Sequence, residues 1–182
     1  MGMNVNLDFF YKTASPFFHL FAGEASKLEG FFKTNTLDGN LHVTFINGRK
    51  CRTTSVLFKE FQRGLQFPSY FGHNWDAFDE CINDLDWLVK ETYLVIIIDS
   101  QELLTSKIDH ISTLHADHFS IFAETLINTA EDWASGLNDD SPSAKAVPFH
   151  VIFHCPQAYA DKMRFKLIKH GIKEINELTI EI

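Results

Sequence analysis

The chain has 182 residues, of which 45% are hydrophobic, and 24 acidic and 16 basic side chains give it a formal net charge of −8. This length and composition are typical of a globular domain with a sizeable core and argue against a disordered chain. Nucleic acid and anionic membranes repel an acidic protein, so we expect neither as a direct partner. The charge favours a basic protein as the partner.

The three cysteines, Cys51, Cys81 and Cys155, form no CxxC pair and are odd in number. They argue against a disulfide framework and against a zinc ribbon, and they fit a reducing compartment. The sequence shows no signal-peptide pattern and no apolar run of the length that a membrane span needs. We therefore expect a cytoplasmic protein.

The hydrophobic pattern predicts strands that alternate with helices along the chain. Short apolar runs between turn residues indicate strands, and apolar residues three or four positions apart indicate helices. The expected strands are 16–21, 41–46, 93–98, 149–154 and a last one that contains Leu178, Ile180 and Ile182. The expected helices are 24–32, 54–65, one that starts near Asn74, most of 102–133, and 156–170, with an exposed loop over 136–148.

This order of elements predicts an α/β fold with a mainly parallel β-sheet flanked by helices. The run 93–98 is apolar at every position, as in a strand that is buried on both faces of a parallel sheet. Asp99 follows it and is expected to cap the next helix, with Glu102 completing a capping box. We expect a single domain over 1–182, in which an extra N-terminal strand–helix unit (1–40) precedes the core (41–182).

The helix that starts near Asn74 is acidic on one side. Asn74 is a suitable N-cap, and Asp76 in the first turn interacts favourably with the helix dipole. The helical spacing places one set of residues on a buried stripe: Trp75, Phe78, Cys81, Ile82 and Leu85. It places another set on the opposite side: Asp76, Asp79, Glu80, Asn83 and Asp84.

Nearly all of the net charge lies in and just after this helix. Residues 74–102 contain eight carboxylates and one lysine, a net charge of −7. Like charges one turn apart, such as Asp76 with Glu80 and Glu80 with Asp84, destabilise a helix by about 0.2–0.5 kcal/mol per pair. A helix selected for stability alone would carry lysines between them. The pattern therefore favours a binding surface, and a solvated acidic face is the alternative.

The segment from Phe67 to Ile82 resembles the barstar family, the intracellular inhibitors of secreted ribonucleases of the barnase type. The residues that carry the resemblance are Phe67-Pro68-x-Tyr70-Phe71-Gly72-x-Asn74-Trp75-Asp76-Ala77-Phe78-x-x-Cys81-Ile82. The resemblance implies a barstar-like fold and an inhibitor that needs neither catalysis nor a cofactor. It implies that the loop and helix plug the nuclease active site through Tyr70, Gly72, Asn74, Trp75, Asp76 and Glu80. We expect Tyr70 to be exposed and Phe71 to pack onto the core.

Two positions depart from the family pattern. The family typically has Asp where this chain has Glu80, and its best-known member has an aromatic residue where this chain has Asp79. The charge at position 80 is kept on a side chain one methylene longer. A ribonuclease site must hold a phosphodiester and is therefore cationic, so a row of carboxylates can occupy its Arg and Lys side chains. Opposite charges also speed the encounter of the two proteins.

Two other functions stay open at the level of sequence. The same acidic surface would serve an immunity protein against a toxin that is not a ribonuclease, such as a DNase. A metal-dependent enzyme is the second alternative, because His115 and His118 are three residues apart and His150 and His154 share a face of a predicted strand. Neither pair has the glutamate of an HExxH motif, and the chain contains no P-loop, GxGxxG or GxSxG.

The helix expected over 156–170 is basic. Its Lys and Arg side chains are Lys162, Arg164, Lys166 and Lys169. The simplest interpretation is a solvated face. Association with the acidic surface of another copy of the chain is the alternative interpretation.

Overall fold

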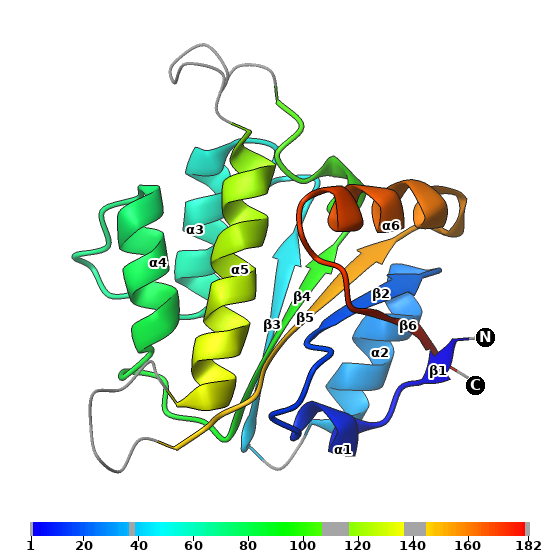
Figure 1. Cartoon of the computed structure of the whole chain (residues 1–182), viewed down its shortest axis with the longest axis horizontal. Coiled ribbons are helices and arrows are strands. Elements are labelled where there is room, and N and C mark those ends of the chain that lie inside the picture. Colours follow the sequence, from blue (N-terminus) through cyan, green and yellow to red (C-terminus); the bar gives the residue numbers. More distant parts are fainter. Residues whose placement is uncertain (1, 37–38, 107–116, 137–144, 181–182) are drawn as a thin grey trace.

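The computed structural model describes residues 2–36, 39–106, 117–136 and 145–180. Its strands form one sheet in the order β1-β6-β2-β5-β4-β3, and every pairing is parallel (Figure 1). The strands are β1 (Met3–Asn4), β2 (Phe18–Ala22), β3 (Leu41–Asn47), β4 (Thr92–Ile98), β5 (Phe149–Cys155) and β6 (Ile175–Thr179). The α-helices are α1 (Leu7–Phe10), α2 (Ala25–Asn35), α3 (Thr54–Gly64), α4 (Trp75–Asp84), α5 (His118–Ser135) and α6 (Ala160–Lys169). The α/β fold with a parallel sheet is confirmed.

Helices cover both faces of the sheet. All seven residues of β4 and all seven of β5 are buried, which explains the uninterrupted apolar runs at these positions. The core on one face combines residues of α3, α4, α5 and α6, and the core on the other face combines residues of α1 and α2. Helix α4 lies at the outer side of the first layer, next to α3 and α5 (Figure 1).

The N-terminal residues contribute an internal strand of the sheet. Strand β2 lies between β5 and β6, and Phe18 is paired with Val151 on one side and with Ile175 on the other. The strand–helix unit expected within 1–40 is present as β2 and α2. Strand β1 and helix α1 were not predicted, because two and four residues are too few to show a hydrophobic period.

The predicted capping box after β4 is wrong. Asp99 has a left-handed backbone (φ 55°) and precedes a 3₁₀ turn, η1 (Ser100–Glu102), without any cap hydrogen bond from its side chain. Its carboxylate instead accepts from Arg49 at 2.7 Å. The long helix predicted from 102 begins at His118, where the side chain of Asp117 accepts from two backbone N–H groups. The part of that prediction over 107–116 lies outside the described residues.

The two C-terminal elements are shifted relative to their predictions. The helix expected from 156 begins with a separate 3₁₀ turn, η3 (Gln157–Tyr159), and α6 follows it. The last strand spans Ile175–Thr179, earlier than its alternating apolar residues indicate, because pairing with β2 sets its extent. Ile182 lies outside the described residues.

The three cysteines are free and buried, and the burial of Cys81 was predicted from its place on the apolar stripe. Burial raises the pKa of the Cys51 thiol to about 12 and that of the Cys155 thiol to about 11, so both remain protonated at neutral pH. Among the described helices, none has the length and apolar character of a membrane span.

Candidate functional site: the acidic face of helix α4

Helix α4 starts as the sequence predicts. The Asn74 side chain accepts a hydrogen bond from the backbone N–H of Ala77 at 2.9 Å, and the backbone of Asn74 is extended. Gly72 precedes this cap closely. A Cβ at Gly72 would lie 3.1 Å from Nδ2 of Asn74 and 3.4 Å from Cβ of Ala77, so glycine lets the loop approach the first turn. Asn74 therefore shapes the start of the helix from within the chain.

The two aromatic residues before the helix separate as predicted. Phe71 is buried, and its ring packs edge-on against Phe67 with centroids 5.1 Å apart. Tyr70 is 71% exposed. The loop thus uses Phe71 to attach itself to the core and presents Tyr70 to solvent beside the acidic helix. An exposed tyrosine of this kind is a common anchor at protein interfaces.

Trp75 was expected both in the buried stripe and on the contact surface. In the structure its burial is intermediate between that of a core residue and that of a surface residue. The indole is half-buried, and its centroid lies 5.0 Å from that of Phe58. Its Nε1–H donates to Nδ1 of His118 at 3.2 Å, and the two rings stack. Trp75 therefore connects α4 to α3 and α5, and part of its ring remains accessible.

The carboxylates of α4 face solvent without cationic partners. Asp76, Asp79 and Glu80 are exposed, Asp84 is half-buried, and Asp86 is exposed just after the helix. Within the part of the chain that the structure describes, none of these five forms an ion pair with a lysine or arginine, although such pairs occur elsewhere, as between Lys33 and Glu29. The negative charge predicted for this face is therefore not neutralised by any lysine or arginine that the structure describes.

A further carboxylate, Asp132, joins the surface from α5. Partial desolvation and then the charges of Asp132 and Asp76 raise the pKa of Asp79, so these three acids lie close enough to interact. Trp133, the neighbour of Asp132, donates from Nε1 to the carbonyl of Ile82 at 3.0 Å and holds α5 against α4. Asp132 was not predicted as part of this surface, because its contribution depends on which side of α5 packs against α4.

Tyr70 lies near the carboxylates at the C-terminal end of α4. Some desolvation and the nearby Cys81, Asp84, Glu80 and Asp86 raise the pKa of the phenol, so it stays a hydrogen-bond donor at neutral pH. The segment after α4 is fixed in place, because Trp87 donates to the carbonyl of Leu65 at 2.9 Å. We define the acidic surface as Tyr70, Asp76, Asp79, Glu80, Asp84, Asp86 and Asp132. It offers many oxygen acceptors and suits a cationic partner.

The described histidines do not form a metal site of the kind that the enzyme alternative requires. His115 lies outside the described residues, and His118 is buried against Trp75. Nδ1 of His150 contacts Nε2 of His19 at 3.1 Å, whereas His154 has separate partners. Burial lowers the pKa of His150 to about 4, so its ring is neutral. Among the described residues, no group of three or more His, Cys, Asp or Glu side chains could hold a metal ion.

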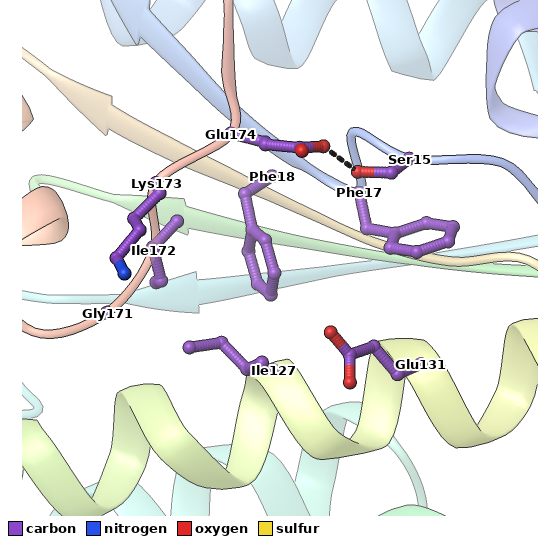
Figure 2. A pocket seen from close by; sticks show the side chains of 9 residues that line it. All are labelled: Ser15, Phe17, Phe18, Ile127, Glu131, Gly171, Ile172, Lys173 and Glu174. Atoms are coloured by element: carbon purple, nitrogen blue, oxygen red, sulfur yellow. Dashed lines mark hydrogen bonds between the residues drawn. The ribbon is translucent and has the colours of Figure 1, made fainter.

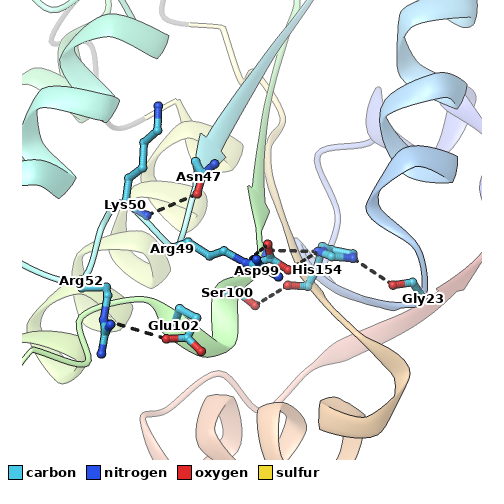
Figure 3. A network of polar contacts seen from close by, with 9 residues as sticks. All are labelled: Gly23, Asn47, Arg49, Lys50, Arg52, Asp99, Ser100, Glu102 and His154. Atoms are coloured by element: carbon cyan, nitrogen blue, oxygen red, sulfur yellow. Dashed lines mark hydrogen bonds and ion pairs between the residues drawn. The ribbon is translucent and has the colours of Figure 1, made fainter.

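The carboxyl ends of the strands, where parallel sheets often bind ligands, carry a closed polar network (Figure 3). His154 accepts from the backbone N–H of Asp99 through Nδ1 at 3.0 Å, and its Nε2–H donates to the carbonyl of Gly23 at 3.1 Å. Ser100 donates from Oγ to the carbonyl of His154 at 2.8 Å. Both ring nitrogens of His154 are thus used within the chain. The network connects the ends of β2, β4 and β5 and has a structural role.

A cavity of about 400 Å³ opens between α5 and the start of β2 (Figure 2). It is lined by Ser15, Phe17, Phe18, Ile127, Glu131, Gly171, Ile172, Lys173 and Glu174. Ser15 donates a hydrogen bond to Glu174 at its rim. None of the lining residues comes from α4, so the cavity is separate from the acidic surface. Glu131 faces this cavity, whereas its neighbour Asp132 interacts with Asp79.

Comparison with known proteins identifies the family. Residues 41–154, more than half of the chain, match the family described as Barstar (barnase inhibitor). The chain belongs to the barstar family. The matched region extends from β3 to β5 and includes α4 and its preceding loop. Among the curated proteins, none has a sequence that matches this chain.

Solved structures share the fold of this chain over a longer stretch than the residues that match the family. Cdc6p from Pyrobaculum aerophilum has a TM-score of 0.58 at 15% identity, over 88% of this chain and 38% of that protein. The Aeropyrum pernix ORC2 protein in its ADP form has a TM-score of 0.56 at 12% identity, over 93% of this chain and 43% of that protein. The chain thus spans less than half the length of these proteins. At such low identity the likeness shows the fold alone.

Proposed function

We propose that this protein inhibits a nuclease by covering the nuclease's cationic active site with the acidic surface. One observation carries the proposal: a cluster of carboxylates that form no ion pair with a lysine or arginine of the described residues lies beside the exposed Tyr70. This cluster lies in the region that matches the family described as Barstar (barnase inhibitor). In this proposal the protein acts in the cytoplasm, blocks the nuclease active site by covering it, and needs no cofactor.

The physical basis is electrostatic complementarity. A nuclease holds a phosphodiester with Arg and Lys side chains, and carboxylate oxygens can form the same charge-assisted hydrogen bonds. The raised pKa values of Asp79 and Asp84 reflect desolvation and mutual repulsion between neighbouring acids. A cationic partner would relieve this repulsion. The free energy of binding therefore includes the release of an unfavourable interaction within the inhibitor.

The residues of the site have different roles in this proposal. Asp76 and Glu80 contact the cationic groups of the nuclease directly, and Tyr70 contributes an aromatic ring with a donor hydroxyl. Gly72 permits close approach of the partner's backbone. Asn74 and Trp75 act mainly by holding the loop and helix in place, since their polar side-chain atoms bond within the chain.

Isothermal titration calorimetry combined with nuclease activity tests the proposal. We would titrate the protein with a barnase-type ribonuclease and, separately, with a basic DNase, at low and at moderate salt. We expect one-to-one binding to the ribonuclease, loss of its activity, and an affinity that falls as salt rises. Binding to the DNase alone would assign the protein to the other class of toxin. Binding to neither nuclease would contradict the proposal.

Two neighbouring residues of α5 provide a matched control. Asp132→Asn removes a charge next to Asp79, whereas Glu131→Gln removes a charge that faces the cavity on another side of the same helix. We expect the first change to weaken nuclease binding and the second to leave it unchanged. Equal effects would show that only the total charge matters and would contradict the proposed surface.

A further inference from the structure

The outward side of α6 combines exposed apolar residues with free lysines. Phe165 is 69% exposed and Ile168 is 45% exposed, and their spacing of three places them on one side of the helix. Lys162 and Lys169 are exposed three residues before and four residues after Phe165, on the same side. We define the α6 surface as Lys162, Phe165, Ile168 and Lys169.

The other two basic residues of α6 are engaged within the chain. Arg164 forms an ion pair with Glu177. Lys166 is half-buried, lies 3.8 Å above the ring of Phe119 and donates to the carbonyl of Leu103 at 3.2 Å. The basic residues of α6 therefore form two groups and not the uniform solvated face expected from the sequence. Lys162 and Lys169 form no ion pair or hydrogen bond with the described residues, so they are available to an external partner.

The packing of α6 does not explain why Phe165 and Ile168 face solvent. Met163 and Leu167 already attach the helix to the core. Adjacent exposed apolar residues with a charged border are typical of an interaction surface. A matching partner would carry carboxylates together with accessible apolar groups.

The chain itself carries such a surface around α4. Beside its carboxylates, Tyr70 is 71% exposed, and Val89, in the segment after the helix, is 82% exposed. Helices α4 and α6 lie at opposite sides of the molecule with α5 between them (Figure 1). The two surfaces are therefore too far apart to meet within one chain, whereas two copies can bring them together.

We propose that the α6 surface of one copy binds the acidic surface of a second copy. Charge complementarity and the exposed apolar residues on both sides carry this assignment. The contact is head-to-tail, because it joins two different patches, so each associated pair keeps one free surface of each kind. Its consequence for regulation rests on the proposed function: self-association covers the acidic surface, and a nuclease would compete with it.

Sedimentation velocity over a range of protein concentrations tests the association. At low salt we expect the average mass to rise with concentration, and at high salt we expect a monomer. The double variant Lys162→Glu/Lys169→Glu places like charges in the contact and should weaken association by at least ~100-fold. The control Lys27→Glu/Lys33→Glu makes the same change in net charge on α2, on the other side of the sheet, and should associate as the unmodified protein does.

A mixing experiment identifies the two surfaces. The variant Asp76→Lys/Glu80→Lys loses the acidic surface and keeps the α6 surface, and Lys162→Glu/Lys169→Glu does the reverse. Each alone should be a monomer, and an equimolar mixture should form pairs that grow no further. Circular dichroism checks that both variants are folded. A monomer at every concentration of the unmodified protein, or no pairing in the mixture, would overturn the proposal.

The same variants keep this proposal distinct from nuclease inhibition. Lys162→Glu/Lys169→Glu retains the acidic surface and should bind the nuclease at least as tightly as the unmodified protein. Self-association without nuclease binding would leave the contact between copies intact and remove its regulatory meaning. Persistence of self-association in Asp76→Lys/Glu80→Lys would indicate a symmetric contact through α6 and would overturn the head-to-tail assignment.

Discussion

Two polar regions of this protein differ in where their partners are. In the network at the carboxyl ends of the strands, the polar groups of His154, Asp99 and Ser100 are satisfied by other groups of the same chain. On the acidic surface, the carboxylates of Asp76 and Glu80 have no cationic partner among the described residues. A polar group that is paired internally contributes to the fold. A cluster of like charges that the fold leaves unpaired indicates a partner outside the chain.

The largest effect is expected for Glu80→Ala. If the acidic surface binds a nuclease, this change should weaken binding by about 2–5 kcal/mol, because the partner's cation is left desolvated and unpaired. The free energy of unfolding should stay the same or rise by a few tenths of a kcal/mol, because two like-charge contacts in the helix are lost. Calorimetry and chemical denaturation measure the two quantities. A loss of stability that matches the loss of binding would show that Glu80 contributes to the fold, as the internally paired residues do.

His154→Ala tests the internally paired network, where we expect a loss of stability without a loss of binding. Removal of the buried ring leaves the N–H of Asp99 and the carbonyl of Gly23 without partners and opens a cavity. We expect a loss of about 2–4 kcal/mol in the free energy of unfolding. Nuclease binding, measured below the unfolding temperature, should be unchanged. A folded variant with weakened binding would show that the two regions are coupled.

The pH dependence of stability tests another internally paired histidine, His150, which contacts His19 in the core and lies outside both regions. Burial lowers the pKa of His150 from 6.5 to about 4 in the folded state, so the unfolded chain takes up its proton first as the pH falls. Stability from this group is therefore complete above pH 6.5 and is lost between pH 6.5 and 4, by up to about 1.4 kcal/mol per pH unit. His150→Phe should flatten the slope measured by denaturation at several pH values. An unchanged slope would contradict a neutral buried ring.

The acidic surface responds to pH in the other direction. Asp79 and Asp84 have raised pKa values in the folded state, because of desolvation and neighbouring carboxylates. Their repulsion is present above these pKa values and disappears as the pH falls through them. Helix α4 should therefore gain local stability in acid while nuclease binding weakens. Hydrogen exchange of the α4 amides and calorimetry at several pH values would follow both changes.

The smallest effect is expected for Asn74→Ala. The cap hydrogen bond to Ala77 is lost, which should reduce the free energy of unfolding by about 1 kcal/mol. Binding should weaken only as far as the first turn frays, because the side chain of Asn74 bonds within the chain. Asn74→Asp keeps the cap and should restore stability. A binding loss as large as that of Glu80→Ala would instead indicate direct contact with the partner.

Much of the fold was predictable because it depends on local patterns. The apolar runs at β4 and β5 predicted buried strands, and Asn74 followed by Asp76 predicted the start of α4. The failures involve residues whose partners are distant in the sequence. Asp99 was expected to cap a helix, but its carboxylate pairs with Arg49, which follows the neighbouring strand β3. The extent of β6 is set by its pairing with β2, which lies more than 150 residues earlier.

The sequence by itself determined the character of the acidic helix, because helical spacing separates Phe78 and Ile82 from Asp76 and Glu80. It also indicated the family, since the motif from Phe67 to Ile82 is continuous in the chain. Tertiary structure alone decided that Asp132 joins this surface, that Trp75 turns toward His118, and that no described cation neutralises the carboxylates. The physical reason is that electrostatic pairing depends on distance in space, which only the packed helices define.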